Sequence, residues 1–480
     1  MKLVWFRRDL RLDDNPALHH AIEDARAQNE PVVALYVATP MQWEKHGLSS
    51  RQADLIFRRL GALQKELSDI GVALFYHQCS SFHDAAEAVI KLVDSNGVTG
   101  VYYNKDYEVD EQQRDTYLQQ ALSNHACHID VIAKDGKCVL PPGSILNKQG
   151  QYFKVFTPFK RAWLTRFATG GNRPLSPPSK QLVAVNRLIS DDFVLFHPDI
   201  AFDYPRESSE RWDASEYDIH KKLQQFCHEH LDDYEERRDI PSTDGTSTLS
   251  AYLAIGALSA RRCIQEASLA ADIEHISQGA QTWISELVWR EFYQHLIYFE
   301  PRLVKNENFL LWGNRLQWRQ DDDWFEAWCT GNTGYPIVDA AMKQLNTTGW
   351  MHNRLRMVVA SFLVKDLQID WRKGEHYFMS KLIDGDFAAN NGGWQWCAST
   401  GCDGQPYFRI FNPISQGERF DAKGEFVRQW LPELEGVPDK FVHAPWNWPQ
   451  FDSLNYPSPM VDHKEQREIT LALYKRAKDS

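Results

Sequence analysis

The sequence contains no run of about 18 consecutive apolar residues, the length that a membrane-spanning helix requires. Its first residues, MKLVWFRRDLRLDD, reach a cluster of charges before the apolar core of a signal peptide could form. These two absences argue against a membrane protein and against a secreted protein of the usual kind. They predict a cytoplasmic location.

Paired cysteines are also missing. The eight cysteines, which include Cys127, form no CxxC motif and show no spacing typical of a zinc site or a disulfide framework. Asp384 and Asp386 have no histidine or third acidic residue close by in the sequence. We therefore expect reduced cysteines that pack in the core, and no metal site.

The sequence contains fewer basic than acidic residues. Lysine and arginine number 53 against 65 acidic residues, which gives a formal net charge of −12. This balance argues against a protein that coats nucleic acid through its overall charge, so any contact with DNA must come from a local basic patch. Residues 141–180 hold seven lysines or arginines, six prolines and no acidic residue, and a solvated linker is the favoured interpretation.

No GxGxxG motif follows the first predicted strand, so the sequence does not support an NAD-dependent oxidoreductase. The N-terminal part instead alternates short apolar runs with helical patterns, which predicts a parallel sheet with crossover helices. The crevice at the strand ends is still able to hold some other ligand. The five predicted strands begin at about Leu3, Pro31, Gly71, Gly100 and Ile129.

Farther along the chain the apolar residues recur at helical spacing, and strand-like runs are almost absent. We predict a Rossmann-like α/β domain with a parallel sheet over residues 1–140. A basic, proline-rich connector is predicted over 141–208, and an all-α domain over 209–475.

Tryptophan is concentrated in this second domain: ten of the 17 lie between Trp283 and Trp396. A large helical core with tryptophan as filler explains this concentration. A site that stacks planar rings or moves electrons explains it equally well, and both interpretations stay open on composition alone.

Two predicted helices, over 283–299 and 350–367, each place polar and bulky side chains at i, i+3, i+4 and i+7, which puts them on one stripe. On a helix that is apolar elsewhere, such a stripe favours the lining of a cavity over a surface ion pair. The first stripe consists of Glu286, Trp289, Arg290 and Tyr293, and the second of Trp350, Asn353, Arg354 and Met357.

Two further segments suggest contact with a ligand. Thr246 and Ser247 precede a predicted helix, where hydroxyl groups either cap the helix or form part of a phosphate cradle; capping is the favoured interpretation. Gly392 and Gly393 precede two tryptophans separated by one residue, and glycine allows a ligand to approach the backbone closely.

Eight motifs follow one another between Val4 and Pro413: VWFRRDLRLDDNPAL, YFKVFTPF, GTSTLSAYLAIGALS, WREFYQHL, TGYPIVDAAMKQL, TGWMHNRLRMVVASFLVKDL, LIDGDFAANNGGWQW and PYFRIFNP. Together they resemble the photolyase and cryptochrome family, and most closely the bacterial class I cyclobutane pyrimidine dimer photolyases. The resemblance implies an α/β antenna domain, a long connector and a helical domain that holds FAD in a bent conformation.

The resemblance also implies the residues that contact FAD. Asn390 falls where the family places a side chain beside flavin N5, and an amide that accepts a hydrogen bond from a protonated N5 stabilises reduced flavin. The implied FAD-binding residues are Tyr234, Thr246, Ser247, Thr248, Leu249, Ser250, Trp283, Arg290, Asn353, Asp384, Gly385, Asp386 and Asn390.

A pocket for a dimer flipped out of the DNA is implied as well. Trp289 and Trp396 would form its apolar walls, and Glu286 would bind a pyrimidine edge and stabilise the radical anion. The implied catalytic residues are Glu286, Trp289, Asn353, Met357 and Trp396. The implied DNA-binding residues are Arg238, Trp289, Arg354, Arg356, Trp396 and Arg409. The implied electron-transfer residues, which would re-reduce flavin from the protein surface, are Trp394, Trp371 and Trp318.

An antenna chromophore is expected in the α/β domain. His46, Glu111 and Lys305 match positions that bind folate in enterobacterial-type enzymes, whereas Asp110 stands where those enzymes commonly have asparagine. We expect 5,10-methenyltetrahydrofolate rather than a deazaflavin or an empty site. Asp110 is expected to weaken its binding, because an ionised carboxylate cannot donate to the pterin edge.

The family includes several activities, and Asn353 and Met357 match the cyclobutane-dimer class rather than the histidine pair of six-four photolyases. The expected function is light-driven repair: excited, reduced FAD (FADH−) gives an electron to the dimer, the cyclobutane ring splits, and the electron returns. The alternative is a blue-light-sensing cryptochrome without repair activity. The expected partner is UV-damaged DNA that contains such dimers, and the protein is expected to be a monomer.

Overall fold

The computed structural model describes residues 1–124, 128–181, 185, 188, 192–200, 202–270 and 276–479. Cys127, one of the eight cysteines considered above, lies outside the described residues. The other seven carry no disulfide bond within the described part of the chain.

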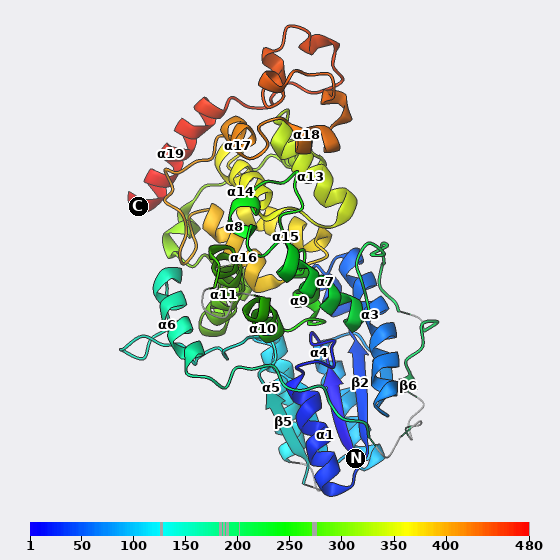
Figure 1. Ribbon diagram of the computed structural model, residues 1–480. Helices are drawn as coiled ribbons and strands as arrows, with labels where there is room; N and C mark the ends of the chain where they lie inside the picture. Colours follow the sequence, from blue (N-terminus) through cyan, green and yellow to red (C-terminus); the bar gives the residue numbers. More distant parts are fainter. Residues whose placement is uncertain are drawn as a thin grey trace. The chain divides into compact units, whose positions relative to one another are not determined.

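The chain packs into two compact units (Figure 1). Unit 1 comprises Met1–Phe153, Thr157–Leu231 and Ser247–Pro301, and unit 2 comprises Lys154–Phe156, Asp232–Thr246 and Arg302–Ser480. The units therefore collect segments that are distant in the sequence. The predicted domain boundaries at residues 140 and 208 divide the chain into consecutive segments, so these units do not test them. The boundaries stay predictions.

Unit 1 contains a six-stranded sheet in the order β5-β4-β1-β2-β3-β6. The pairs β1–β2, β1–β4, β2–β3 and β4–β5 are parallel, which confirms the predicted parallel sheet. β1, β2 and β4 are buried at every residue, as expected when helices cover both faces of a parallel sheet (Figure 1). The five strands that the sequence predicts are β1 (Lys2–Phe6), β2 (Val32–Ala38), β3 (Ala73–Gln78), β4 (Gly100–Asn104) and β5 (Asp130–Lys134).

The helices of unit 1 alternate with these strands and then continue beyond them. Those between the strands are α1 (Pro16–Gln28), α2 (Pro40–Lys45), α3 (Ser50–Asp69), α4 (Phe82–Asn96) and α5 (Val109–Ser123). Those that follow are α6 (Phe156–Ala168), whose first residue belongs to unit 2, α7 (Glu216–Glu229), α9 (Ser250–Ile255), α10 (Ala260–Ala270) and α11 (Gln278–Phe299). The predicted connector over 141–208 thus contains a helix, α6, and an additional short strand, β6 (Val194–Leu195), which pairs antiparallel with β3.

The strand order reverses between β1 and β4, the point where open α/β sheets usually bind ligands. Buried side chains from the ends of both strands meet there. The Asp9 carboxylate accepts from the Arg7 amide and from Asn104 Nδ2, each at 2.6 Å, and Arg7 Nη1 donates to Asp115 Oδ1 at 2.6 Å. These hydrogen bonds join the polar groups to one another, whereas Arg7 Nε is buried without a hydrogen-bond partner among the described residues.

Unit 2 is mainly helical, as the sequence predicts. Its principal helices are α8 (Tyr234–Arg237), α12 (Asp322–Thr330), α13 (Pro336–Thr348), α14 (Asn353–Ser361), α15 (Trp371–Lys381), α16 (Phe387–Cys397), α17 (Pro413–Phe420), α18 (Glu425–Trp430) and α19 (His463–Asp479). Shorter turns are η1 (Pro301–Lys305), whose first residue belongs to unit 1, η2 (Leu311–Arg315), η4 (Pro432–Leu434), η5 (Asp439–Phe441), η6 (Pro445–Asn447) and η7 (Phe451–Ser453), and η3 (Phe362–Asp366) is a π-helical turn. An isolated parallel bridge joins Arg319 to Ile369.

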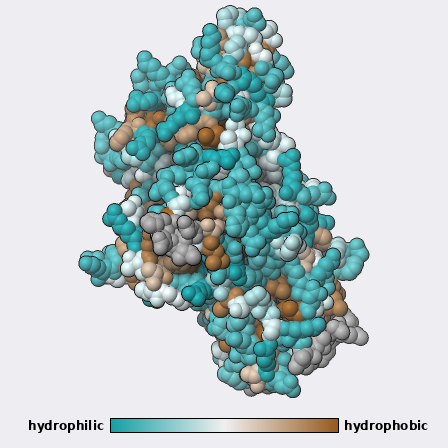
Figure 2. Space-filling view, in the orientation of Figure 1, coloured by the Kyte–Doolittle hydropathy of each residue, from teal (hydrophilic) through white to brown (hydrophobic). Residues whose placement is uncertain are grey.

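In the view of Figure 2 most of the visible surface is hydrophilic, with smaller apolar patches between. Among the described residues, no helix combines the length and the apolar composition that crossing a bilayer would require.

Candidate functional site

Helix α11 carries the first predicted stripe, and the structure confirms that its residues lie on one helix of unit 1. Glu286, Trp289, Arg290 and Tyr293 are each neither fully buried nor fully exposed. The Trp289 ring lies against that of Tyr293, with the centroids 5.7 Å apart. Arg290 holds two other segments of the unit, because its guanidinium donates to the carbonyl oxygens of Lys137 at 2.9 Å and Leu253 at 3.2 Å.

The second predicted stripe begins later than expected. Helix α14 starts at Asn353, because the side chain of His352 accepts a hydrogen bond from the Arg354 amide and caps the helix. The expectation that Trp350 belongs to this helix is therefore wrong, although Asn353, Arg354 and Met357 do lie on it. Arg354 Nη1 is 3.7 Å from the sulfur of Met357.

The predicted DNA-binding arginines of unit 2 have different surroundings. Arg354 makes a two-pronged ion pair with Asp239, at 3.2 and 2.7 Å, and Arg238 Nε lies 3.8 Å from the same carboxylate. Arg356 Nη2 donates to Asp384 Oδ2 at 2.7 Å, so two residues that the sequence assigns to different ligands are paired. Arg409 is exposed, and its guanidinium has no ionic or hydrogen-bonding partner within the part of the chain that the structure describes.

The segment from Asp384 to Gly393 has an unpaired polar atom and open space, the features expected where a ligand binds. Asp384 Oδ1 is buried and has no hydrogen-bond partner among the described residues. Buried carboxylate oxygens normally accept a hydrogen bond, so a bound ligand is expected to supply the donor. Asp386 caps α16 by accepting from the Ala389 amide at 3.1 Å. A Cβ atom placed on Gly393 would meet no described neighbour within 4 Å. The unpaired acceptor at Asp384 and the open space at Gly393 each suit a polar, ring-containing cofactor such as FAD.

The segment around Thr246 and Ser247 does not cap a helix through its hydroxyls. Helix α9 begins at Ser250, its N-cap residue is Leu249, and no side chain accepts from its first turn. The favoured interpretation of Thr246 and Ser247 as capping residues is therefore wrong. Thr248 has a φ of +49°, a conformation that a β-branched residue rarely adopts and that is often found at ligand-binding sites.

Two aromatic residues assigned to FAD lie in different units. Trp283 is buried in unit 1, with its ring centroid 5.2 Å from that of Phe226. Tyr234 is buried in unit 2, with the Arg238 guanidinium 5.5 Å from its ring centroid.

The three predicted electron-transfer tryptophans all lie in unit 2. Trp371 is fully buried and donates through Nε1 to Asn308 Oδ1 at 3.0 Å, and Trp394 is 2% exposed. Trp318 is partly exposed and packs edge-on against Tyr474 at 6.3 Å. The Arg319 amide donates to the Gln368 carbonyl at 2.8 Å, which holds the segment of Trp318 beside the start of α15. The three residues thus range from full burial to partial exposure.

Gly374 permits the close packing of α15 on α16. A Cβ atom there would overlap the Trp394 ring and approach Leu363 Cδ2 to 2.6 Å. We expect Gly374→Ala to displace this ring and to lower the free energy of unfolding by about 1–3 kcal/mol, as overpacking does. Urea denaturation of the FAD-free protein measures this loss.

Gly393→Ala is the matched control for Gly374→Ala, since it adds the same methyl group to α16 in open space. It should leave the unfolding free energy unchanged or raise it slightly, because alanine favours a helix over glycine. Equal destabilisation by the two variants would contradict the proposed packing role of Gly374.

The predicted antenna residues of unit 1 form a polar cluster. His46 Nε2 and Gln42 Nε2 each lie 3.0 Å from Asp110 Oδ2. Burial alone would raise the pKa of Asp110, but the contact with His46 and the charge of Lys45 lower it below its usual range. Burial and the neighbouring Glu108 raise the pKa of Glu111, whose Oε2 is buried without a described hydrogen-bond partner. Lys305 is an exposed residue of unit 2.

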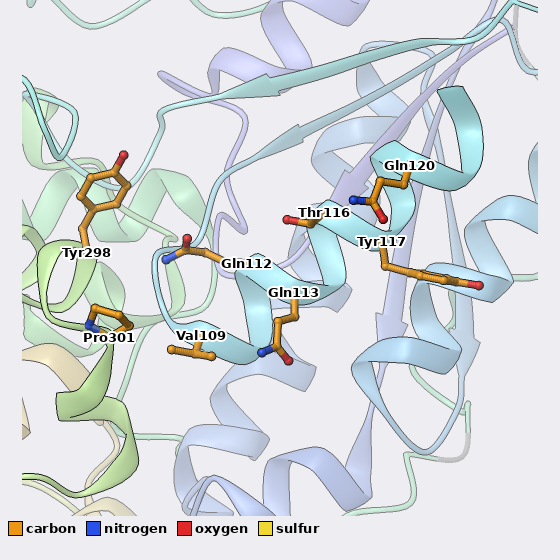
Figure 3. A pocket seen from close by; sticks show the side chains of 8 residues that line it. All are labelled: Val109, Gln112, Gln113, Thr116, Tyr117, Gln120, Tyr298 and Pro301. Carbon is orange, nitrogen blue, oxygen red and sulfur yellow. The ribbon is translucent and has the colours of Figure 1, made fainter. Parts of the chain in front are cut away.

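A cavity of about 420 Å³ lies on the outer side of α5 in unit 1. Figure 3 shows side chains of α5 along it, with Tyr298 and Pro301 at one end. The cavity is not predictable from the sequence, because neutral glutamine and threonine side chains on an exposed helix face give no chemical pattern. Its lining residues are Val109, Gln112, Gln113, Thr116, Tyr117, Gln120, Tyr298 and Pro301.

Comparison with known proteins covers the whole chain. Residues 2–180 match a family model described as DNA photolyase, and residues 283–476 match one described as the FAD binding domain of DNA photolyase. The deoxyribodipyrimidine photo-lyase of Vibrio cholerae is 56% identical over 481 residues, which cover 100% of both chains.

Solved structures agree with this comparison. The crystal structure of a class III photolyase from Agrobacterium tumefaciens matches with a TM-score of 0.86 and 34% identity, over 100% of this chain and 98% of that one. A cryptochrome from Synechocystis sp. matches with a TM-score of 0.83 and 27% identity, over 98% of this chain and 99% of that one. The fold is therefore shared by a photolyase and by a cryptochrome.

Proposed function

The chain belongs to the DNA photolyase family, and from this premise we propose that it repairs UV-damaged DNA as a light-driven deoxyribodipyrimidine photo-lyase. The observation that carries the proposal is the 56% identity to the Vibrio cholerae photo-lyase over the whole of both chains. The substrate is a cyclobutane pyrimidine dimer in DNA, and the products are the two restored pyrimidines.

FAD is the cofactor of this family, and in its reduced state it supplies, on excitation, the electron that splits the dimer and takes it back afterwards. The residues of the chain fit it, as the orphaned Asp384 Oδ1 and the open space at Gly393 indicate. We assign the binding of FAD to the residues implied by the sequence, with Asp384, Asp386 and Asn390 on the polar segment before and within α16.

The remaining residues receive and orient the dimer. The Trp289 and Trp396 rings offer apolar walls, and neither is fully buried, so a flipped base is able to reach them. Asn353 and Met357 supply a polar and an apolar contact from adjacent turns of α14. The Glu286 carboxyl group hydrogen-bonds a pyrimidine edge and stabilises the charge that the dimer carries during the reaction.

Illumination of the purified protein with a dimer-containing oligonucleotide tests the proposed function. We expect the dimers to disappear at a rate that depends on blue light and on chemically reduced FAD, with no reaction in the dark. Binding of FAD without any loss of dimers would refute the repair function and favour the blue-light-sensing alternative.

Arg409 is the arginine best placed for a phosphate contact, because it is exposed and its charge is not neutralised within the described chain. Replacing Arg409 with glutamine should weaken DNA binding and reduce the slope of log affinity against log salt by about one. Binding of a dimer-containing duplex, titrated at several salt concentrations, measures this slope.

Arg356→Gln serves as the comparison for Arg409→Gln, because the Arg356 guanidinium is engaged by Asp384 at 2.7 Å. This variant should leave the salt slope nearly unchanged and lower the unfolding free energy instead, since it strands a buried carboxylate. A normal slope in Arg409→Gln would rule out a phosphate contact by Arg409. A slope unaffected by replacing all four predicted arginines would place the DNA elsewhere, with the basic stretch 141–180 as the next candidate.

Folate is our proposal for the antenna, supported by the buried Glu111 Oε2, which is an acceptor for the amino group and ring N–H of a pterin. The absorption spectrum of the purified protein, before and after reconstitution with 5,10-methenyltetrahydrofolate, tests the proposal. A deazaflavin spectrum would refute it.

For the setting of the reaction, we propose a cytoplasmic protein that acts as a monomer. Sedimentation of the purified protein tests the monomeric state, and a stable dimer would refute it.

A further inference from the structure

The side-chain amide of Asn390 is held in one orientation by the neighbouring helix. Its Nδ2 donates to the backbone carbonyl of Glu375, on α15, at 3.0 Å. Its Oδ1 has no partner among the described residues and is left as an acceptor. A flip of this amide would bring Oδ1 against the Glu375 carbonyl oxygen, and two acceptors repel each other.

The side chain of Glu375 holds the next residue of α16. It is 4% exposed, and its Oε1 accepts from Asn391 Nδ2 at 2.8 Å. Asn391 Oδ1 in turn accepts from Gln395 Nε2 at 2.9 Å, and Gln395 Oε1 accepts from the Phe309 amide at 2.8 Å. A single residue of α15 therefore ties two consecutive residues of α16, one through its backbone and one through its carboxyl group.

The hydrogen bond between Glu375 and Asn391 does not depend on the charge of the Glu375 carboxyl group. Burial raises the pKa of Glu375 to about 7, against the lowering effects of the Asn391 hydrogen bond and the Arg372 charge, and Asp370 raises it further. Near neutral pH the group is thus partly protonated. Its carbonyl oxygen accepts from Asn391 in either state, as the amide oxygen of a glutamine also would.

The orientation of Asn390 matters because the two redox states of flavin differ at N5. Reduced flavin presents an N5–H donor there, whereas oxidised flavin presents a lone pair. An amide whose oxygen faces N5 accepts a hydrogen bond from reduced flavin, whereas it repels the lone pair of oxidised flavin. It therefore favours binding of the reduced state. An amide free to flip would serve both states almost equally.

We propose that Glu375 is a positioning residue that keeps the oxygen of Asn390 directed toward the flavin, and that it thereby makes the protein prefer reduced over oxidised FAD. The inference rests on the proposed placement of Asn390 beside flavin N5. Glu375 acts through Asn391 and the spacing of α15 and α16, without touching the reacting atoms.

The test compares Glu375→Ala, Glu375→Gln and the unaltered protein loaded with FAD. The midpoint potential of bound FAD, measured by spectroelectrochemistry against free FAD, gives the ratio of the affinities for the reduced and oxidised states. We expect Glu375→Ala to lower this ratio about tenfold, which equals about 30 mV for a two-electron couple. Glu375→Gln should restore it to within about twofold of the unaltered protein.

Asp339→Ala is the matched control. Asp339 is also a fully buried carboxylate of unit 2, and it accepts from the Thr333 amide at 2.8 Å and the Gly334 amide at 3.0 Å. The Thr333 and Tyr456 hydroxyl groups also donate to Asp339, so its loss should destabilise the FAD-free protein at least as much as Glu375→Ala does, as judged by urea denaturation, while the affinity ratio stays unchanged.

An unchanged ratio in Glu375→Ala, or an equal drop in Asp339→Ala, would overturn the positioning role. Failure of Glu375→Gln to restore the ratio would also overturn it, because the charge would then be the active property. These outcomes are separate from a failure of the proposed function, which would appear as absence of dimer repair by the unaltered, FAD-loaded protein.

Discussion

Replacing Trp318 with phenylalanine should abolish the lasting photoreduction of bound, oxidised FAD. Trp371 and Trp394 are buried, whereas Trp318 is partly exposed, so Trp318 is the member of the set that an external thiol is able to reach. Phenylalanine is much harder to oxidise than tryptophan, so the positive charge left by electron transfer cannot reach the solvent. We expect the yield of reduced FAD under blue light and thiol to fall at least tenfold.

Trp312→Phe is the matched control for Trp318→Phe. The Trp312 ring packs on the same Tyr474, at 6.0 Å against 6.3 Å for Trp318, yet it belongs to no predicted electron path. This control should photoreduce normally, as followed by transient absorption. Once FAD has been reduced with dithionite, the Trp318 variant should repair dimers like the unaltered protein; loss of repair under that condition would make Trp318 a structural residue.

Replacing Glu286 with alanine should lower the quantum yield of repair about tenfold, with a much smaller effect on binding of damaged DNA. A hydrogen bond from a carboxyl group contributes most when its partner carries charge, and the dimer is charged only after it has received the electron. The measurement is the quantum yield at saturating DNA, alongside the dissociation constant of the same oligonucleotide.

Glu286→Gln separates hydrogen bonding from charge at this position. The amide keeps a hydrogen-bonding group of similar size, so this variant should retain more of the yield than Glu286→Ala does. An unchanged yield combined with lost binding in Glu286→Ala would reverse the role, and Glu286 would then be a recognition residue.

The strands were predictable because their pattern is local. β1, β2 and β4 are largely apolar and are buried at every residue, so the sequence alone indicates them. β6 was not predictable, since its two residues, Val194 and Leu195, are each 46% exposed and owe their conformation to pairing with β3. A run of apolar residues can therefore be recognised in the sequence, whereas the pairing of a short strand at the edge of the sheet cannot.

The start of α14 was misplaced for a related reason. The spacing of Trp350 continues the helical period, but periodicity does not report which backbone amides are capped. The side chain of His352 decides the boundary by accepting from the Arg354 amide. Histidine is not among the usual capping residues, so no familiar pattern marked it.

The candidate site was predicted residue by residue only through resemblance, and its pairings came from tertiary structure. Arg356 and Asp384 are 28 positions apart, and nothing in their spacing indicates an ion pair. The orientation of the Asn390 amide likewise depends on a carbonyl of another helix. Residue types can be predicted from a motif, but the direction of an amide requires the packed helices.

The hydrogen bond from the Arg319 amide to the Gln368 carbonyl has a consequence for motion. It joins the segment of Trp318 to the residues just before Trp371, so the two backbones fluctuate together instead of independently. Hydrogen exchange at the Arg319 amide should then be slow, as for the rest of the buried helical core. Electron hopping rates fall steeply with the gap between rings, so a gap that thermal motion scarcely changes gives one rate constant rather than a broad spread, and the decay of the oxidised tryptophan should fit a single exponential.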